Sequence, residues 1–216
     1  METTYIEIDS PDKHLSDVLE EIPSNVILYK TLSGIGATYS EIKAQRHSII
    51  IEPNVPVIIG KCNSAKHKND NLLGVYEGVT TDRIIKYLGA SRGKYNKILT
   101  THESFTKVID AFLIFNGKIY NTCFLLIDEA HKTIKDVDYR SDIVLPMNDF
   151  FKFKGKALVS ATPLKFSDPR FEENGFSIIK IAPTYDTAKE SDIKPSTNIL
   201  REVWEEFGWM PFITGQ

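Results

Sequence analysis

Two adjacent carboxylates follow an apolar run near the middle of the chain. Residues 124–131 read FLLIDEAH, so four apolar side chains precede Asp128 and Glu129. One carboxylate of such a pair can hold Mg²⁺, usually through water, and the next can orient or deprotonate the water that attacks a γ-phosphate. A capping aspartate at the solvated end of a strand is the alternative interpretation. The apolar run that delivers both carboxylates to one strand end favours the chemical role.

A glycine turn lies earlier in the chain, within LYKTLSGIGATYSEI at 28–42. Gly34 and Gly36 allow backbone N–H groups to approach an anion closely, and a following helix adds its partial positive charge. The hydroxyl of Thr38 is placed to reach Mg²⁺. A tight turn without a ligand is the alternative. The residues expected to line this phosphate site are Gly34, Ile35, Gly36, Ala37 and Thr38.

A third segment, KALVSATPL at 156–164, places two hydroxyls just past an apolar strand. Ser160 and Thr162 are predicted to lie near the same edge as the carboxylate pair. There they can hydrogen-bond the loop that carries the carboxylates and report the state of a nucleotide. A serine or threonine that caps a helix before a proline is the alternative.

Taken together, GIGAT, IDEAH and SATP resemble motifs I, II and III of superfamily-two helicases of the DEAD/DEAH type, in order and spacing. IIIEPN at 49–54 resembles motif Ia, and ILTTHESF at 98–105 resembles motif Ib. In that family both segments face the nucleic-acid backbone. The resemblance implies backbone contacts by Pro53, Thr100 and Thr101. It also implies coupling of the site to a second domain by His131, Ser160 and Thr162.

The resemblance implies an ATP-dependent helicase or translocase motor domain with ATP and Mg²⁺ as cofactors. Asp128 and Thr38 would hold the metal, and Glu129 would activate water. The expected partners are single-stranded or duplex nucleic acid and a second RecA-like domain, in the same longer chain or in trans. The alternative is a catalytically degenerate domain that binds nucleic acid or protein without turnover.

Motif I departs from the family pattern. The family has a lysine before the threonine, whereas this chain has Ala37. That lysine is a principal positive charge of the phosphate cradle. Lys30, before the glycine turn, and Lys43, after it, are the candidates to replace it. We favour Lys30 as a nucleotide-binding residue; an exposed lysine at a strand end is the alternative.

These motifs require a fold that brings strand ends together. The pattern predicts helices over 37–46, 80–87 and 104–115. It predicts strands over 25–30, 47–52, 72–76, 97–101, 123–128, 156–160 and 176–181. Strands that are apolar on both faces and alternate with helices are typical of an α/β fold with a mostly parallel sheet and helices on both faces. Together with the resemblance, this predicts a RecA-like P-loop NTPase domain, in which ligands bind at the carboxyl ends of the strands.

The predicted domain spans residues 1–183. Residues 184–216 turn polar and then carry both tryptophans, which predicts a linker and a C-terminal helix over 199–212. We expect this segment to lead toward a missing second RecA-like domain.

Composition excludes several other classes. The net charge is −3, so the chain is not basic overall, although a basic stretch over 43–97 permits a local phosphate-binding face. Cys62 and Cys123 form no CxxC pair, which argues against a zinc site or a disulfide scaffold. No secretory signal and no membrane-spanning apolar run occur, so a cytoplasmic location is expected.

Overall fold

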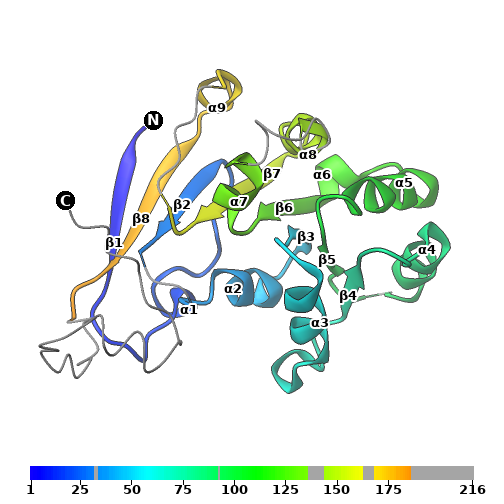
Figure 1. The fold of residues 1–216 in the computed structure, drawn as a ribbon, viewed down its shortest axis with the longest axis horizontal. Coiled ribbons are helices and arrows are strands. Elements are labelled where there is room, and N and C mark those ends of the chain that lie inside the picture. The colour runs from blue at the N-terminus through cyan, green and yellow to red at the C-terminus, as the bar shows by residue number, and fades with distance from the viewer. Residues whose placement is uncertain (32–33, 92, 136–143, 163–167, 186–216) are drawn as a thin grey trace, which may run out of the picture. The chain divides into compact units, whose positions relative to one another are not determined.

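A computed structural model describes residues 1–31, 34–91, 93–135, 144–162 and 168–185. Met1–Tyr185 forms one compact unit (Figure 1). The predicted C-terminal helix, with both tryptophans, lies outside the described residues.

The unit is built on one eight-stranded sheet in the order β1-β8-β2-β7-β6-β3-β5-β4. Every strand pair is parallel. The strands are β1 (Thr3–Ile8), β2 (Val26–Lys30), β3 (His47–Ile51), β4 (Leu72–Val75), β5 (Lys97–Thr100), β6 (Cys123–Ile127), β7 (Gly155–Ser160) and β8 (Ser177–Pro183). The predicted α/β fold with a largely parallel sheet is confirmed, and the described sheet is parallel throughout.

Helices cover both faces of the sheet. They are α1 (Leu15–Val18), α2 (Ala37–Lys43), α3 (Val55–Asn63), the 3-10 helix η1 (Ala65–His67), α4 (Thr81–Ala90), α5 (Phe105–Phe115), α6 (Ile119–Thr122), α7 (Ala130–Lys135), α8 (Val144–Phe150) and α9 (Arg170–Glu173). One hydrophobic core cluster contains side chains of α1, α2 and α3. The other contains side chains of α4, α5, α6 and α9. Figure 1 shows α2 and α3 on one side of the strands and α5 and α6 on the other.

The central strands are mostly apolar because both of their faces are buried. In β3, Ile49 and Ile51 belong to the cluster under α4 and α5, whereas Ile50 belongs to the cluster under α2 and α3. The same alternation runs through β6, where every residue is buried. This alternation decides which side chains at the strand ends face α2.

Several elements were not predicted from the sequence. They are β1, at one edge of the sheet, α3, after β3, and the short helices α1, η1, α6, α7, α8 and α9. Among the described residues, no helix combines the length and apolar character that crossing a membrane requires.

Candidate functional site

Four polar side chains converge at the carboxyl ends of β2 and β6. Lys30 is the last residue of β2, Asp128 and Glu129 follow β6, and Thr38 lies in the first turn of α2. The Lys30 Nζ atom lies 3.2 Å from Asp128 Oδ1 and 2.6 Å from Glu129 Oε1. The hydroxyl of Thr38 donates a short hydrogen bond to the other oxygen of Asp128. Lys30 and Asp128, which are 98 positions apart in the sequence, are therefore in direct contact.

The charges of this cluster reinforce one another. Burial opposes ionisation of Asp128, but Lys30 and the hydrogen bond from Thr38 outweigh it, so the pKa of Asp128 lies below its ordinary value. Burial also disfavours the charged form of Lys30, yet Asp128 and Glu129 hold the pKa of Lys30 above its ordinary value. An ammonium group and an ionised carboxylate therefore face each other at neutral pH.

The glycine turn has the backbone conformation that its sequence predicts. Gly34 and Gly36 have φ angles of 85° and 86°, in the left-handed region that favours glycine. The carbonyl of Ile35 between them accepts a hydrogen bond of 2.9 Å from the backbone N–H of Leu15. The segment before β2 therefore contacts the turn and helps to fix its conformation.

Ala37 contributes to packing. Its side chain is 3% exposed and belongs to the same core cluster as Leu15 and Ile35. The position where the family carries a lysine is thus filled by a small apolar group. Lys43, the other candidate replacement, contacts Asp70 at 2.7 Å instead of the carboxylate pair.

Glu129 has an unusual backbone conformation. Its φ angle is 50°, a left-handed value that is uncommon for residues other than glycine. Its N–H donates a 2.8 Å hydrogen bond to Asp128 Oδ1, which helps to hold the turn. Strained backbone of this kind concentrates at functional sites.

The residues predicted to couple the site to a second domain lie next to Glu129 and to one another. The Nδ1 atom of His131 is 3.4 Å from Glu129 Oε2 and 3.3 Å from the hydroxyl of Ser160. That hydroxyl donates to the carbonyl of Thr162 at 2.7 Å, so its proton is directed away from the histidine ring. His131 and Ser160 are thus brought together with Glu129, whereas Thr162 joins them through its backbone.

The predicted nucleic-acid residues lie at the same edge of the sheet. Thr100 ends β5, and its fully buried hydroxyl donates to the carbonyl of Thr101 at 3.1 Å. Thr101 is also buried, and its N–H donates to Val75. Pro53 is partly exposed after β3. The Thr100 hydroxyl stabilises the loop after β5, and the predicted contact with nucleic acid stays a prediction.

The oxygen donors fit Mg²⁺. Mg²⁺ in nucleotide sites is bound by one or two protein oxygens together with phosphates and water. The hydroxyl of Thr38 and the carboxylate of Asp128 supply two such oxygens in contact with each other. Within the described part of the chain, no group of three or more histidine, cysteine, aspartate or glutamate residues could hold a metal alone.

One buried carboxylate at this edge was not predicted. Glu52 directly follows β3 and is 1% exposed. It lies inside the segment that resembles motif Ia. Its position one residue after a buried strand could have marked it as a candidate site residue. Only the register of β3 with β6 shows that it lies beside Asp128.

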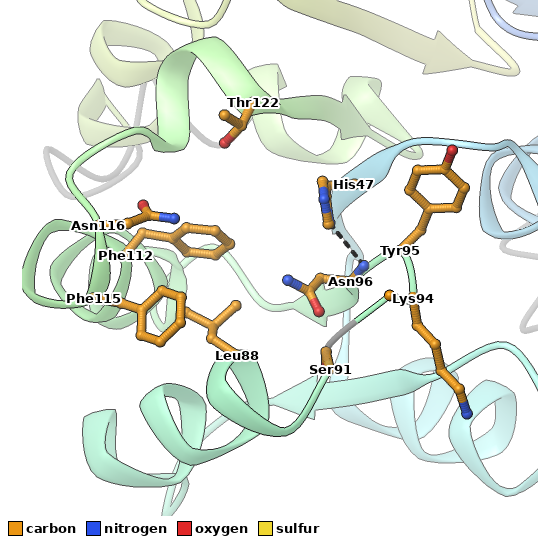
Figure 2. A pocket seen from close by; sticks show the side chains of 11 residues that line it. His47, Leu88, Ser91, Lys94, Tyr95, Asn96, Phe112, Phe115, Asn116 and Thr122 are labelled. Atoms are coloured by element: carbon orange, nitrogen blue, oxygen red, sulfur yellow. Dashed lines mark hydrogen bonds between the residues drawn. The ribbon is translucent and has the colours of Figure 1, made fainter.

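A separate pocket of about 540 Å³ lies at the amino ends of the strands, opposite the ends that carry the carboxylates. It is lined by His47, Asn96 and Thr122, which lie at the amino ends of β3, β5 and β6, and by Phe112 and Phe115 of α5 (Figure 2). The Asn96 N–H donates a 2.9 Å hydrogen bond to His47 across its wall. No predicted site residue lines this pocket, so it is separate from the candidate site at the carboxyl ends of the strands.

The fold and the site define an α/β protein whose all-parallel sheet carries a lysine, a threonine hydroxyl and two carboxylates in contact at its carboxyl edge. A scan against protein-family models finds no matching family, and a search among curated proteins finds no matching relative.

Proposed function

We propose that this chain is a RecA-like P-loop ATPase domain of the helicase or translocase type, in which Lys30 replaces the motif I lysine. The observation that carries the proposal is the contact between Lys30, Thr38, Asp128 and Glu129. These are the residue types that hydrolysis of a nucleoside triphosphate requires, and three separate elements contribute them. Gly34 and Gly36, between Lys30 and Thr38, have left-handed φ angles, which supports a turn whose backbone N–H groups could approach a phosphate.

Each residue has a role in the proposed reaction. Thr38 and Asp128 would hold Mg²⁺, which would supply charge stabilisation to the phosphates when bound. Lys30 stabilises the negative charge of the β- and γ-phosphates. Glu129 orients the attacking water and accepts its proton. His131 contacts the other oxygen of the Glu129 carboxylate, and Ser160 contacts His131.

The pairing of Lys30 with Glu129 supports a nucleotide-dependent change. The Lys30 Nζ atom lies closer to Glu129 than to Asp128, at 2.6 Å against 3.2 Å. A phosphate that attracts Lys30 frees the Glu129 carboxylate to accept a proton. Binding of the nucleotide would therefore complete the catalytic site.

The coupling to nucleic acid rests on the motif order and on position. Pro53 and the loop after β5 lie at the same edge as the carboxylates, so a strand bound there would lie near the nucleotide. A second RecA-like domain, in the same longer chain or in trans, would close the nucleotide site from the other side.

ATP hydrolysis by the purified chain tests the proposal, measured with and without single-stranded DNA and single-stranded RNA. We expect turnover that Glu129→Gln reduces by at least about 100-fold, because the water loses its proton acceptor. Glu173→Gln, at the exposed end of α9, is the matched control and should hydrolyse ATP like the wild type.

The alternative is a degenerate domain that binds nucleic acid or protein without turnover. Tight ATP binding without hydrolysis, unchanged by nucleic acid or by Glu129→Gln, would favour that alternative and contradict the proposed ATPase.

A further inference from the structure

Glu52 is a buried carboxylate that the proposed reaction has not used. It is 1% exposed, and its N–H donates a 2.8 Å hydrogen bond to the carbonyl of Thr100. A carboxylate is costly to bury unless it is paired. Its location at the carboxyl edge calls for an explanation beyond core packing.

The strand register brings Glu52 level with Asp128. Ile51 of β3 is opposite Ile127 of β6, and the Asp128 N–H donates a 3.0 Å hydrogen bond to the Ile51 carbonyl. The next residue of each strand is therefore Glu52 on one side and Asp128 on the other. Adjacent strands lie about 4.8 Å apart, so the two backbones are immediate neighbours.

Both side chains project to the same face. Side chains alternate along a strand, and Ile50 and Leu126, two residues earlier, belong to the core cluster that α2 and α3 cover. Glu52 and Asp128 therefore both face these helices. The hydrogen bond from Thr38 of α2 to Asp128 agrees with this direction.

Lys61 of α3 holds the Glu52 carboxylate in place. Its Nζ atom lies 2.6 Å from Glu52 Oε1, and its side chain is 26% exposed. Burial raises the pKa of Glu52, Lys61 opposes that rise, and the neighbouring Asp128 adds to it. Lys61 also helps to lower the pKa of Asp128. The two carboxylates and Lys61 thus interact electrostatically.

A purely structural ion pair is a weak explanation for this arrangement. Buried ion pairs contribute little net stability compared with apolar residues of similar size. The alternative use of a fixed carboxylate beside a metal ligand is to bind the water on the metal. Groups of this outer shell orient the ligands and tune metal affinity, and Mg²⁺ usually keeps several of its waters.

We propose that Glu52, fixed by Lys61, is a positioning residue of the Mg²⁺ site and accepts a hydrogen bond from water bound to the metal on Asp128 and Thr38. The inference rests on the proposed ATP site, which it deepens by adding a third carboxylate. Glu52 thereby links α3, and the loop predicted to meet nucleic acid, to the metal.

The test measures ATP affinity by calorimetry across a Mg²⁺ titration that starts in EDTA. In Glu52→Gln, we expect the Mg²⁺ concentration for half-maximal enhancement of ATP binding to rise about 10- to 100-fold. Affinity in EDTA should match the wild type. Mn²⁺ binding to the ATP complex, followed by electron paramagnetic resonance, should weaken in parallel.

Two further variants keep the test decisive. Asp70→Asn removes another lysine-paired carboxylate on the same side of the sheet and should leave the Mg²⁺ midpoint unchanged. Lys61→Gln frees Glu52 without altering a buried acid, and it should raise the midpoint in the same direction. If the Glu52→Gln variant does not fold, Lys61→Gln provides the test in its place.

The outcomes separate the two proposals. An unchanged midpoint, or an equal loss of affinity with and without Mg²⁺, would overturn the role of Glu52 and leave the ATP site standing. A wild-type chain that binds no ATP at any Mg²⁺ concentration would overturn the proposed function, and the role of Glu52 with it.

Discussion

In the proposed site, Lys30 supplies the positive charge that the helicase pattern would place at position 37. Lys30 ends β2 and reaches both carboxylates, while Ala37 is packed beside Leu15. A lysine at the end of β2 can reach the site because the side chains of Lys30 and Asp128 extend to the same face of the sheet. Under the proposal, Lys30 provides the positive charge, and position 37 needs no long side chain that would displace the segment before β2.

The first prediction concerns moving the lysine back. Ala37→Lys places a long charged side chain at a buried position, where the alanine is only 3% exposed. We expect the free energy of unfolding to fall by about 1–3 kcal/mol, because overpacking and burial of an unpaired charge both destabilise the fold. Urea denaturation measures this change. Ser16→Lys, at an exposed position of the adjacent α1, is the control and should change stability little.

The double variant Lys30→Ala/Ala37→Lys completes this test. We expect it to bind ATP no better than Lys30→Ala alone. Full ATP affinity and full stability in the double variant would mean that position 37 faces the phosphates, contrary to the packing of Ala37.

At the scale of elements, the apolar strands were predictable and the polar or irregular elements were not. β2, β3, β5, β6 and β7 are apolar on both faces, so composition alone locates them within one or two residues. β1 reads TTYIEI and is mostly exposed, so it lacks the apolar run of a buried strand. Backbone pairing with β8 makes it a strand.

Helix α3 shows a second limit of sequence reasoning. VPVIIGKCN contains four β-branched residues, a proline and a glycine, which give no helical signal. The proline lies in the first turn, where its missing N–H is harmless, and Asn54 caps the helix by accepting a 3.1 Å hydrogen bond from Val57. Because α3 was not predicted, the approach of Lys61 to Glu52 was also out of reach.

The second prediction concerns how closely α3 packs on β4. A Cβ atom added at Gly74 would lie 2.8 Å from Ile58 of α3 and 3.3 Å from Cys62. We expect Gly74→Ala to lower the free energy of unfolding by about 1–3 kcal/mol, because α3 must move away from the sheet. Chemical denaturation with matched m-values measures the loss.

Gly60 provides the matched control within the same helix. A Cβ atom there meets no atom within 4 Å. Gly60→Ala should therefore stabilise the fold by about 0.5–1 kcal/mol, because alanine loses less backbone entropy in a helix. Equal effects of the two substitutions would contradict the close contact between α3 and β4.

At the scale of the whole molecule, the sequence could indicate residues of the candidate site but not their geometry. The motif order anticipated Thr38, Asp128 and Glu129, and their proximity follows from the parallel sheet. The direction of Lys30, the burial of Thr100 and the location of Glu52 depend on strand register and side-chain alternation. Those features emerge only when the strand order is known.

The third prediction concerns stability and pH. Lys97 is 2% exposed, and its Nζ atom donates to the carbonyls of Glu41 and Ala44 and to the hydroxyl of Ser48. Burial lowers the pKa of Lys97 from 10.5 to about 8. Because the unfolded chain binds this proton more tightly, stability should rise as pH increases through the window from about 8 to 10.5.

The measurement compares the wild type with Lys97→Met. The free energy of unfolding of the wild type should gain on the order of 2 kcal/mol relative to this variant between about pH 7 and about pH 9.5. Lys154→Met, at an exposed position, should show no such pH-dependent difference. A constant difference for Lys97→Met would mean that Lys97 titrates at its ordinary pKa in the folded protein.

The central claim is that Lys30 supplies the positive charge that binds the phosphates, and the affinity for Mg²⁺-ATP tests it most directly. Calorimetry on the wild type, Lys30→Ala and Lys43→Ala compares the two candidate lysines, of which Lys43 is engaged with Asp70. We predict that Lys30→Ala loses at least about 10-fold in affinity, because one charge-assisted contact contributes roughly 1.5–3 kcal/mol. Lys43→Ala should bind like the wild type. Unchanged affinity in a folded Lys30→Ala protein would contradict the account.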